Sequence, residues 1–96
     1  MEAQTWFVND WFLGSDFRDG NIPLPIMLMN EGYDVWLGNY RGTKYSLKHK
    51  TLDSSDKNSD YWKFSIAEKG MLDVPAAIKQ IQKTSNVEKV AYMGFS

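Results

Sequence analysis

Residues 89–96, "KVAYMGFS", decide how the rest of the chain is interpreted. Residues 89–93 are mostly apolar, which favours a β-strand. Gly94 and Ser96 follow with one residue between them, so this strand would lead into Gly-x-Ser. That is half of the Gly-x-Ser-x-Gly pattern, in which a tight turn lifts a serine oxygen above the edge of a sheet. The stretch predicts a nucleophilic serine at position 96, although Gly-x-Ser also occurs in many ordinary loops.

A second strand is predicted earlier in the chain. In "YDVWLGN", residues 33–39, three consecutive apolar residues stand between Gly32 and Gly38. Such a run is typical of a strand buried on both faces of a parallel sheet. The predicted order is helix, strand, loop, helix, strand. A strand–helix–strand order indicates a right-handed parallel crossover, so we expect an α/β fold.

The helices are predicted from their ends. Two prolines near residue 23 and a glycine at residue 32 bound a short helix over 23–31. Ser65 and Glu68 have the spacing of a capping box. A face made of Met71, Val74, Ile78 and Ile81 follows. Because Pro75 interrupts it, we expect one helix to end near residue 72 and Asp73 to cap a second helix that reaches about residue 84.

Residues 39–60 form a long polar segment, which we predict to be a loop with a helical turn near 58–63. Its basic stretch "TKYSLKHK" is followed at once by aspartates, so a solvated loop is favoured over a phosphate site. His49 is the only histidine, and it precedes Ser96, whereas the base follows the acid and the serine in the Gly-x-Ser-x-Gly enzymes. A structural role is therefore favoured for His49.

Composition excludes several functional classes. The chain has 96 residues, of which 43% are hydrophobic and 15% aromatic, and its net charge is −1. That charge gives no electrostatic case for binding nucleic acid or an anionic membrane in bulk. The absence of cysteine removes disulfides, thiolate zinc sites and a cysteine nucleophile. No run is long and apolar enough to span a bilayer, and the first residues lack the pattern of a secretory signal. We predict no metal site and no cofactor.

Four stretches together carry a resemblance to a known family: "GYDVWLGNYRG", "YSLKHKTL", "YWKFSIAEKGMLDVPAAI" and "VAYMGFS". They resemble, in order, the acid lipase family of α/β hydrolases, which contains gastric and lysosomal acid lipases and fungal steryl ester hydrolases. The match runs over residues 23–96 within a single domain at 1–96. Phe95 stands where the animal enzymes usually have histidine, which favours the fungal branch.

The resemblance implies a partial α/β-hydrolase fold that ends at the nucleophile elbow, with Ser96 as the nucleophile. Asp73 would lie in the structural start of a helix, and Arg41 and Gly42 in the turn after the fourth strand. The implied substrates are carboxylic esters of long acyl chains, with sterol or glycerol as the alcohol. The implied reaction is acyl transfer to Ser96, followed by hydrolysis of the acyl-enzyme. Members of the family are secreted, lysosomal, or bound to lipid droplets or membranes. For a fungal-type parent we expect association with a lipid droplet or membrane, and the location of this chain itself is left open.

The sequence departs from the family in what it lacks. The strand with the His-Gly oxyanion loop, the residues after Ser96, the acidic triad member, the base histidine and the acyl-binding cap have no counterpart. We therefore expect a fragment with no useful esterase activity by itself. The missing strand belongs between the two that are kept, so the isolated piece should be unstable or aggregate. Two alternatives remain: a small non-catalytic α/β interaction module, and a truncated paralogue that binds lipid or acts as a decoy.

Overall fold

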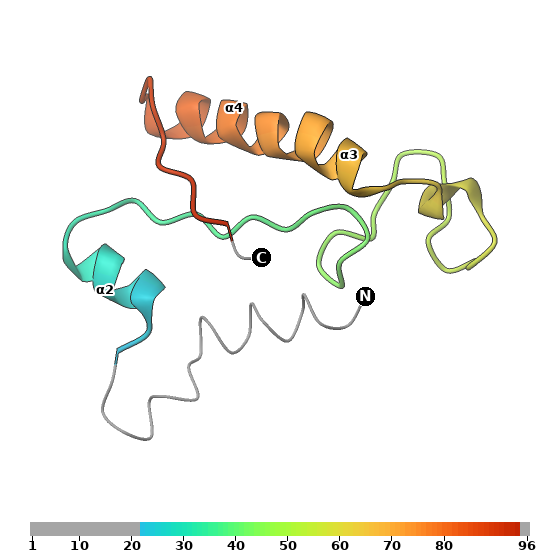
Figure 1. Ribbon diagram of the computed structural model, residues 1–96, viewed down its shortest axis with the longest axis horizontal. Helices are drawn as coiled ribbons and strands as arrows, with labels where there is room; N and C mark the ends of the chain where they lie inside the picture. The colour runs from blue at the N-terminus through green and yellow to red at the C-terminus, as the bar shows by residue number, and fades with distance from the viewer. Residues whose placement is uncertain (1–21, 95–96) are drawn as a thin grey trace.

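The computed structural model describes residues 22–94, and a long helix crosses one side of it (Figure 1). The elements are α2 (Leu24–Asn30), the short 3₁₀ helix η2 (Asp60–Trp62), α3 (Ile66–Glu68), the π-helical η3 (Lys69–Asp73) and α4 (Val74–Ser85). The last three run on without a break and make up the long helix. None of the helices in the described part is long and apolar enough to cross a membrane.

Helix α2 confirms the helix predicted over residues 23–31. It begins after Pro23, and Pro25 occupies its first turn, where a missing N–H costs nothing. At its other end Gly32 has φ +90°, and its N–H donates to the Met29 carbonyl while the Tyr33 N–H donates to the Leu28 carbonyl. These two bonds form the Schellman motif, which needs a left-handed residue at the position of Gly32.

The start of the long helix confirms the predicted capping box. The Ser65 hydroxyl accepts from the Ala67 N–H, and the Glu68 carboxylate accepts from the Ser65 N–H at 2.7 Å. Hydrogen bonds from the Ser65 hydroxyl and N–H lower the pKa of Glu68 to about 2. Glu68 therefore stays ionised, and keeps the cap closed, down to strongly acidic pH.

The predicted break before Pro75 is wrong, and so is the predicted capping role of Asp73. The chain remains helical through Asp73, which has φ −70° and ψ −46° and makes no side-chain cap bond. The break is avoided by a wide turn, in which the Val74 N–H donates to the Lys69 carbonyl five residues back. A proline ring clashes with the carbonyl four residues before it and offers no N–H. A wider turn at that point removes the need for the missing bond.

The wide turn also changes which residues share a face. Val74, Ile78 and Ile81 are half-buried, as the predicted apolar face requires. Met71, predicted on the same face, is 76% exposed. The spacing argument assumed 3.6 residues per turn throughout, and a π turn holds more residues, so it rotates Met71 away from the other three.

The two predicted strands, 33–39 and 89–93, form no ladder with each other, and the described residues contain no strand. Two side-chain hydrogen bonds nevertheless connect the regions that contain these segments. Near the start of one, Asp34 accepts a hydrogen bond from Ser85 at the end of α4. Farther along, the hydroxyls of Tyr40 and Tyr92 lie 2.6 Å apart. The α/β fold class remains a prediction.

Little of the described chain is buried. The buried residues are Pro23, Pro25, Thr43 and Tyr61. Many large apolar side chains are exposed, and they occur in all the described segments: Ile22, Leu24, Met27, Met29, Tyr33, Trp36, Leu37, Tyr45, Leu52, Ile66, Met71, Leu72, Val87, Tyr92 and Met93. By contrast, Tyr61 is the only large hydrophobic residue buried in the described part. The described part therefore contains no hydrophobic core of ordinary size.

Candidate functional site

Ser96, the predicted nucleophile, and Phe95 lie outside the described residues. The approach to them is described as far as Gly94. A Cβ built on Gly94 would lie 3.0 Å from the Cε1 atom of the Tyr92 ring, so the ring lies directly over this glycine. Tyr92 itself is 61% exposed and is tied to the rest of the molecule by its hydroxyl, which bonds to that of Tyr40. This hydrogen bond comes first among the effects that raise the pKa of Tyr40, followed by burial.

Next to Tyr40, Arg41 is held by Asp73 of η3 through both its side chain and its backbone. The guanidinium donates from Nη2 to Oδ1 at 2.7 Å and from Nε to Oδ1 at 2.9 Å, and the Arg41 N–H donates to Oδ2 at 3.0 Å. The side chains are 36% and 17% exposed, respectively. This arrangement fixes a turn of the long loop onto the long helix, 32 residues later in the chain.

The charges of the Arg41–Asp73 pair stabilise each other. Burial of the Asp73 carboxylate by itself raises its pKa, but the hydrogen bonds from Arg41, together with the charges of Arg41 and Lys69, outweigh burial and lower it. The same hydrogen bonds raise the pKa of Arg41. Both groups are therefore ionised at neutral pH, and both carboxylate oxygens of Asp73 accept hydrogen bonds from Arg41.

The turn that contains Arg41 is packed tightly. Gly42 has φ +81°, and a Cβ there would lie 2.5 Å from the Cζ atom of Phe64 and 3.3 Å from Trp62. Thr43 is 7% exposed, and its hydroxyl donates to the Tyr40 carbonyl. Only glycine combines this backbone conformation with so close an approach of two rings. The loop predicted over residues 39–60 is thus ordered at its start, and its predicted helical turn is confirmed by η2.

His49 has the structural role that the sequence favours. Its Nδ1 atom accepts from the Thr51 N–H at 3.1 Å and from the Leu52 N–H at 2.9 Å, and its ring meets Tyr61 edge to face. A histidine that serves as base to a serine donates its Nδ1–H to a carboxylate. Because Nδ1 of His49 is an acceptor here, this geometry does not suit it to that role.

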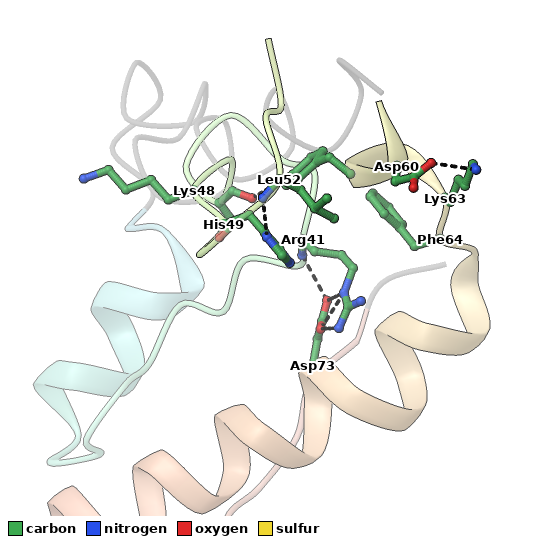
Figure 2. A pocket seen from close by; sticks show the side chains of 10 residues that line it. Arg41, Lys48, His49, Leu52, Asp60, Lys63, Phe64 and Asp73 are labelled. Carbon is green, nitrogen blue, oxygen red and sulfur yellow. Dashed lines mark hydrogen bonds and ion pairs between the residues drawn. The ribbon is translucent and has the colours of Figure 1, made fainter. Parts of the chain in front are cut away.

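A cavity of about 320 Å³ opens between the loop and the start of the long helix (Figure 2). Arg41, His49, Tyr61 and Asp73 are among its lining residues, and none of the lining residues comes from 89–94. Its cationic groups are not free to bind an anion at its centre. Arg41 is neutralised by Asp73, Lys63 pairs with Asp60 at 2.6 Å, and Figure 2 shows Lys48 extending away from the centre.

Two aspartates that follow the basic stretch accept hydrogen bonds from neighbouring residues of the same loop. Asp53 accepts from the N–H and hydroxyl of Ser55, and Asp56 accepts from the Asn58 N–H. In the part of the chain that the structure describes, no three acidic or histidine side chains are gathered as metal ligands. These bonds are those of a self-contained solvated loop.

The sequence missed the two contacts that organise this region. The sequence predicts Arg41 in a turn and Asp73 at the start of a helix, but it does not predict that the two side chains pair. The contact between Tyr40 and Tyr92 was not predicted either. No pattern in the sequence indicated the first pair, because Asp73 before Pro75 is typical of a helix cap. No signal in the sequence indicated the second pair.

The comparisons with known proteins agree on one activity name. The chain is 52% identical over its whole length to a probable lipase of Schizosaccharomyces pombe, of which it covers 18%. It is 45% identical over 76 residues to lipase 1 of Drosophila melanogaster, covering 79% of the chain and 17% of that protein. Over 76 residues it is 42% identical to human lipase member M, covering 79% of the chain and 18% of the relative.

No family model matches the chain, and no solved structure matches it. The chain spans less than a fifth of the length of these curated relatives. Within that span, however, the S. pombe protein matches every part of it, including residues 89–96. The chain is therefore related in sequence to lipases, and it matches one segment of each of these relatives.

Proposed function

We propose that this chain is the segment of a lipid carboxylic-ester hydrolase that carries the nucleophile, Ser96. The observation that carries the proposal is the similarity to proteins named lipases at 42–52% identity. The Gly-x-Ser ending, which by itself is a weak signal, gains weight because it lies in that matched span. The local geometry supports the proposal as well, since Tyr92 is folded against Gly94, the small residue before the serine.

The proposed reaction proceeds in two steps. The Ser96 hydroxyl loses its proton to a base as its oxygen attacks the acyl carbonyl, and the alcohol leaves with a proton to give an acyl-enzyme. Water then attacks the same carbonyl, releasing the fatty acid and restoring the serine. The base in this proposal comes from outside residues 1–96, because His49 uses its Nδ1 atom as an acceptor for two backbone N–H groups. The 96-residue chain is therefore proposed to be inactive by itself.

The proposed fold is part of an α/β hydrolase. Asp34 bonds to Ser85 and Tyr40 bonds to Tyr92, so the contacts follow the same order along both segments, and the long helix lies between them in the sequence. This order supports the proposed strand–helix–strand unit. They touch through side chains and form no ladder. This is the arrangement expected if a third strand, outside residues 1–96, belongs between them. The exposed apolar side chains are what such a unit would bury against the remaining sheet.

The finer assignment is to esters of long acyl chains with sterol or glycerol. Phe95, in place of the histidine usual in the animal members of the resembling family, favours the fungal steryl ester hydrolase branch. Such substrates are insoluble, so the enzyme would work at a lipid-droplet or membrane surface. Neither a cofactor nor a metal is part of the proposal, because a serine nucleophile with a base and an oxyanion site suffices for the reaction.

The second candidate is a non-catalytic module that binds lipid or another protein. The large exposed apolar surface favours it. The two candidates differ in what Ser96 does, because a binding module needs no serine hydroxyl at that position.

The experiment compares the natural full-length protein with its Ser96→Ala variant, using emulsified triacylglycerol and steryl oleate. Ser54→Ala, in the long loop, is the matched control. We expect hydrolysis of at least one ester, unchanged by Ser54→Ala and reduced at least about 10³-fold by Ser96→Ala. Lipid binding without hydrolysis, the same in all three proteins, would favour the binding module instead.

A further inference from the structure

Two segments far apart in the sequence are joined by a pair of tyrosine hydroxyls. The Tyr40 and Tyr92 oxygens lie 2.6 Å apart, although the residues are 52 positions apart. In the described part of the chain, no backbone hydrogen bond links residues 33–40 to residues 89–94. The hydroxyl pair is therefore the polar contact that sets where residue 92 lies relative to the turn at residue 40.

Tyr40 is a fixed point for this contact. Its carbonyl accepts from the Thr43 N–H at 3.3 Å and from the Thr43 hydroxyl at 3.0 Å, and Thr43 is buried. The next residue, Arg41, is bound through its backbone N–H and its guanidinium to Asp73. Residues 40 and 41 are thus anchored both within their turn and to the long helix.

Tyr92 extends this contact as far as Gly94. Its ring lies over Gly94, with Cε1 at 3.0 Å and the hydroxyl oxygen at 3.5 Å from where a Cβ would be. Gly94 precedes Ser96 by two residues. A ring that is held at its hydroxyl and pressed against Gly94 restricts the directions in which the backbone can leave that glycine.

Resting on the proposed function, we propose that Tyr40 and Tyr92 are positioning residues for the nucleophile at position 96. Neither touches the substrate in this proposal. Their hydroxyl bond holds residues 92–94 against the anchored turn, and residue 94 comes two positions before the serine in the sequence. Misplacing a reacting group by about 1 Å is enough to lower the rate roughly 10²-fold, so a smaller displacement caused by losing this one hydrogen bond should lower kcat by about tenfold.

The test uses the natural full-length protein and steady-state hydrolysis of p-nitrophenyl butyrate. The variants are Tyr40→Phe, Tyr92→Phe and the double variant, each of which keeps the ring and removes only hydroxyls. Tyr33→Phe is the matched control, because Tyr33 is 64% exposed and precedes the anchored turn. Ser96→Ala is measured in the same series.

We expect kcat to fall about tenfold in each single variant, with KM within about twofold of the parent value. The double variant should lose no more than a single one, because one bond is removed in all three. Tyr33→Phe should leave kcat unchanged. A melting curve shows that each variant is folded at the assay temperature.

Two results would overturn different claims. If Ser96→Ala abolishes hydrolysis but the tyrosine variants keep the parent kcat, or lose activity only in proportion to their unfolded fraction, the positioning role is wrong and the proposed function stands. If Ser96→Ala keeps full activity, the proposed function is wrong, and the positioning role with it.

Discussion

Breaking the Arg41–Asp73 pair should weaken folding by an amount set by its partial burial. The pair has a 2.7 Å contact, a second guanidinium bond at 2.9 Å and a backbone bond at 3.0 Å, and its side chains are 36% and 17% exposed. Fully exposed ion pairs contribute about 0.2–1 kcal/mol, and truncating a fully buried one costs about 3–5 kcal/mol. Because the Arg41 side chain is partly exposed, solvent screens the pair, and we expect a coupling free energy between the two side chains of about 1–2 kcal/mol.

The assay is a double-mutant cycle of Arg41→Gln and Asp73→Asn, followed by urea unfolding of the natural full-length protein. The cycle isolates the pair, because each single change also removes contacts with other groups. Lys63 and Asp60 provide the matched control, with an equally short contact of 2.6 Å but side chains 75% and 67% exposed. Their coupling should stay below about 0.5 kcal/mol.

The coupling between Arg41 and Asp73 also depends on pH. The pKa of Asp73 is lower in the folded protein than in the unfolded chain. The stabilisation is therefore fully present above the unfolded pKa of about 3.9 and is lost as the pH falls through the lower folded value. The coupling should be equal at pH 7 and pH 5 and should shrink below about pH 4. A coupling under about 0.3 kcal/mol at pH 7, or one no larger than that of the exposed pair, would refute the reasoning.

Three further predictions concern stability in the same protein. Gly42→Ala should lower the free energy of unfolding in urea by about 2–3 kcal/mol, because it adds a steric clash to a left-handed backbone. Gly32→Ala should lower it by only about 1 kcal/mol, because φ is +90° but the described residues leave the added Cβ uncrowded. Equal costs would contradict the close approach of Phe64. Ser65→Ala should cost about 1 kcal/mol and reduce the helical circular dichroism signal, and no change would mean that the cap is not formed. The hydrogen bond to Tyr92 raises the pKa of Tyr40 in the folded protein. The bond therefore stabilises the fold fully below the unfolded pKa of about 10, and this stabilisation is lost as the pH rises through the folded pKa. The free energy of unfolding of Tyr40→Phe should lack this loss at alkaline pH.

The helix ends could be predicted from the sequence because their causes are local. The Schellman turn at Gly32 and the capping box at Ser65 each depend on residues within five positions of one another. Prolines and glycines constrain the backbone by their own covalent geometry. Such features need no knowledge of the rest of the fold.

The wide turn before Pro75 could not be predicted by the same means. A proline after a run of helical residues can either end the helix or be accommodated by a π turn, and the sequence favoured the first. The pairing with Arg41 favours the second, since it holds Asp73 from a segment 32 residues away. The error at Met71 follows from the same turn.

The long-range contacts could not be predicted from the sequence, and the two strands stay a prediction, for a different reason. The bond between Tyr40 and Tyr92 depends on how two distant segments are placed, and single-residue patterns carry no such information. The strands at 33–39 and 89–93 require partners to form a ladder, and the described residues supply none. For the candidate site, the prediction of Ser96 rests on its motif and on the family resemblance, and it stays a prediction. The structural role predicted for His49 agrees with the two backbone N–H groups that its Nδ1 atom accepts.

Labelling of the natural full-length protein with a fluorophosphonate tests the central claim most directly, because the probe bonds covalently only to an activated serine. Peptide mass spectrometry then identifies the modified residue. We predict a single adduct on the peptide that contains Ser96 and none in the Ser96→Ala variant. An unmodified Ser96 in a protein that hydrolyses lipid esters, or an adduct on another serine, would contradict the account.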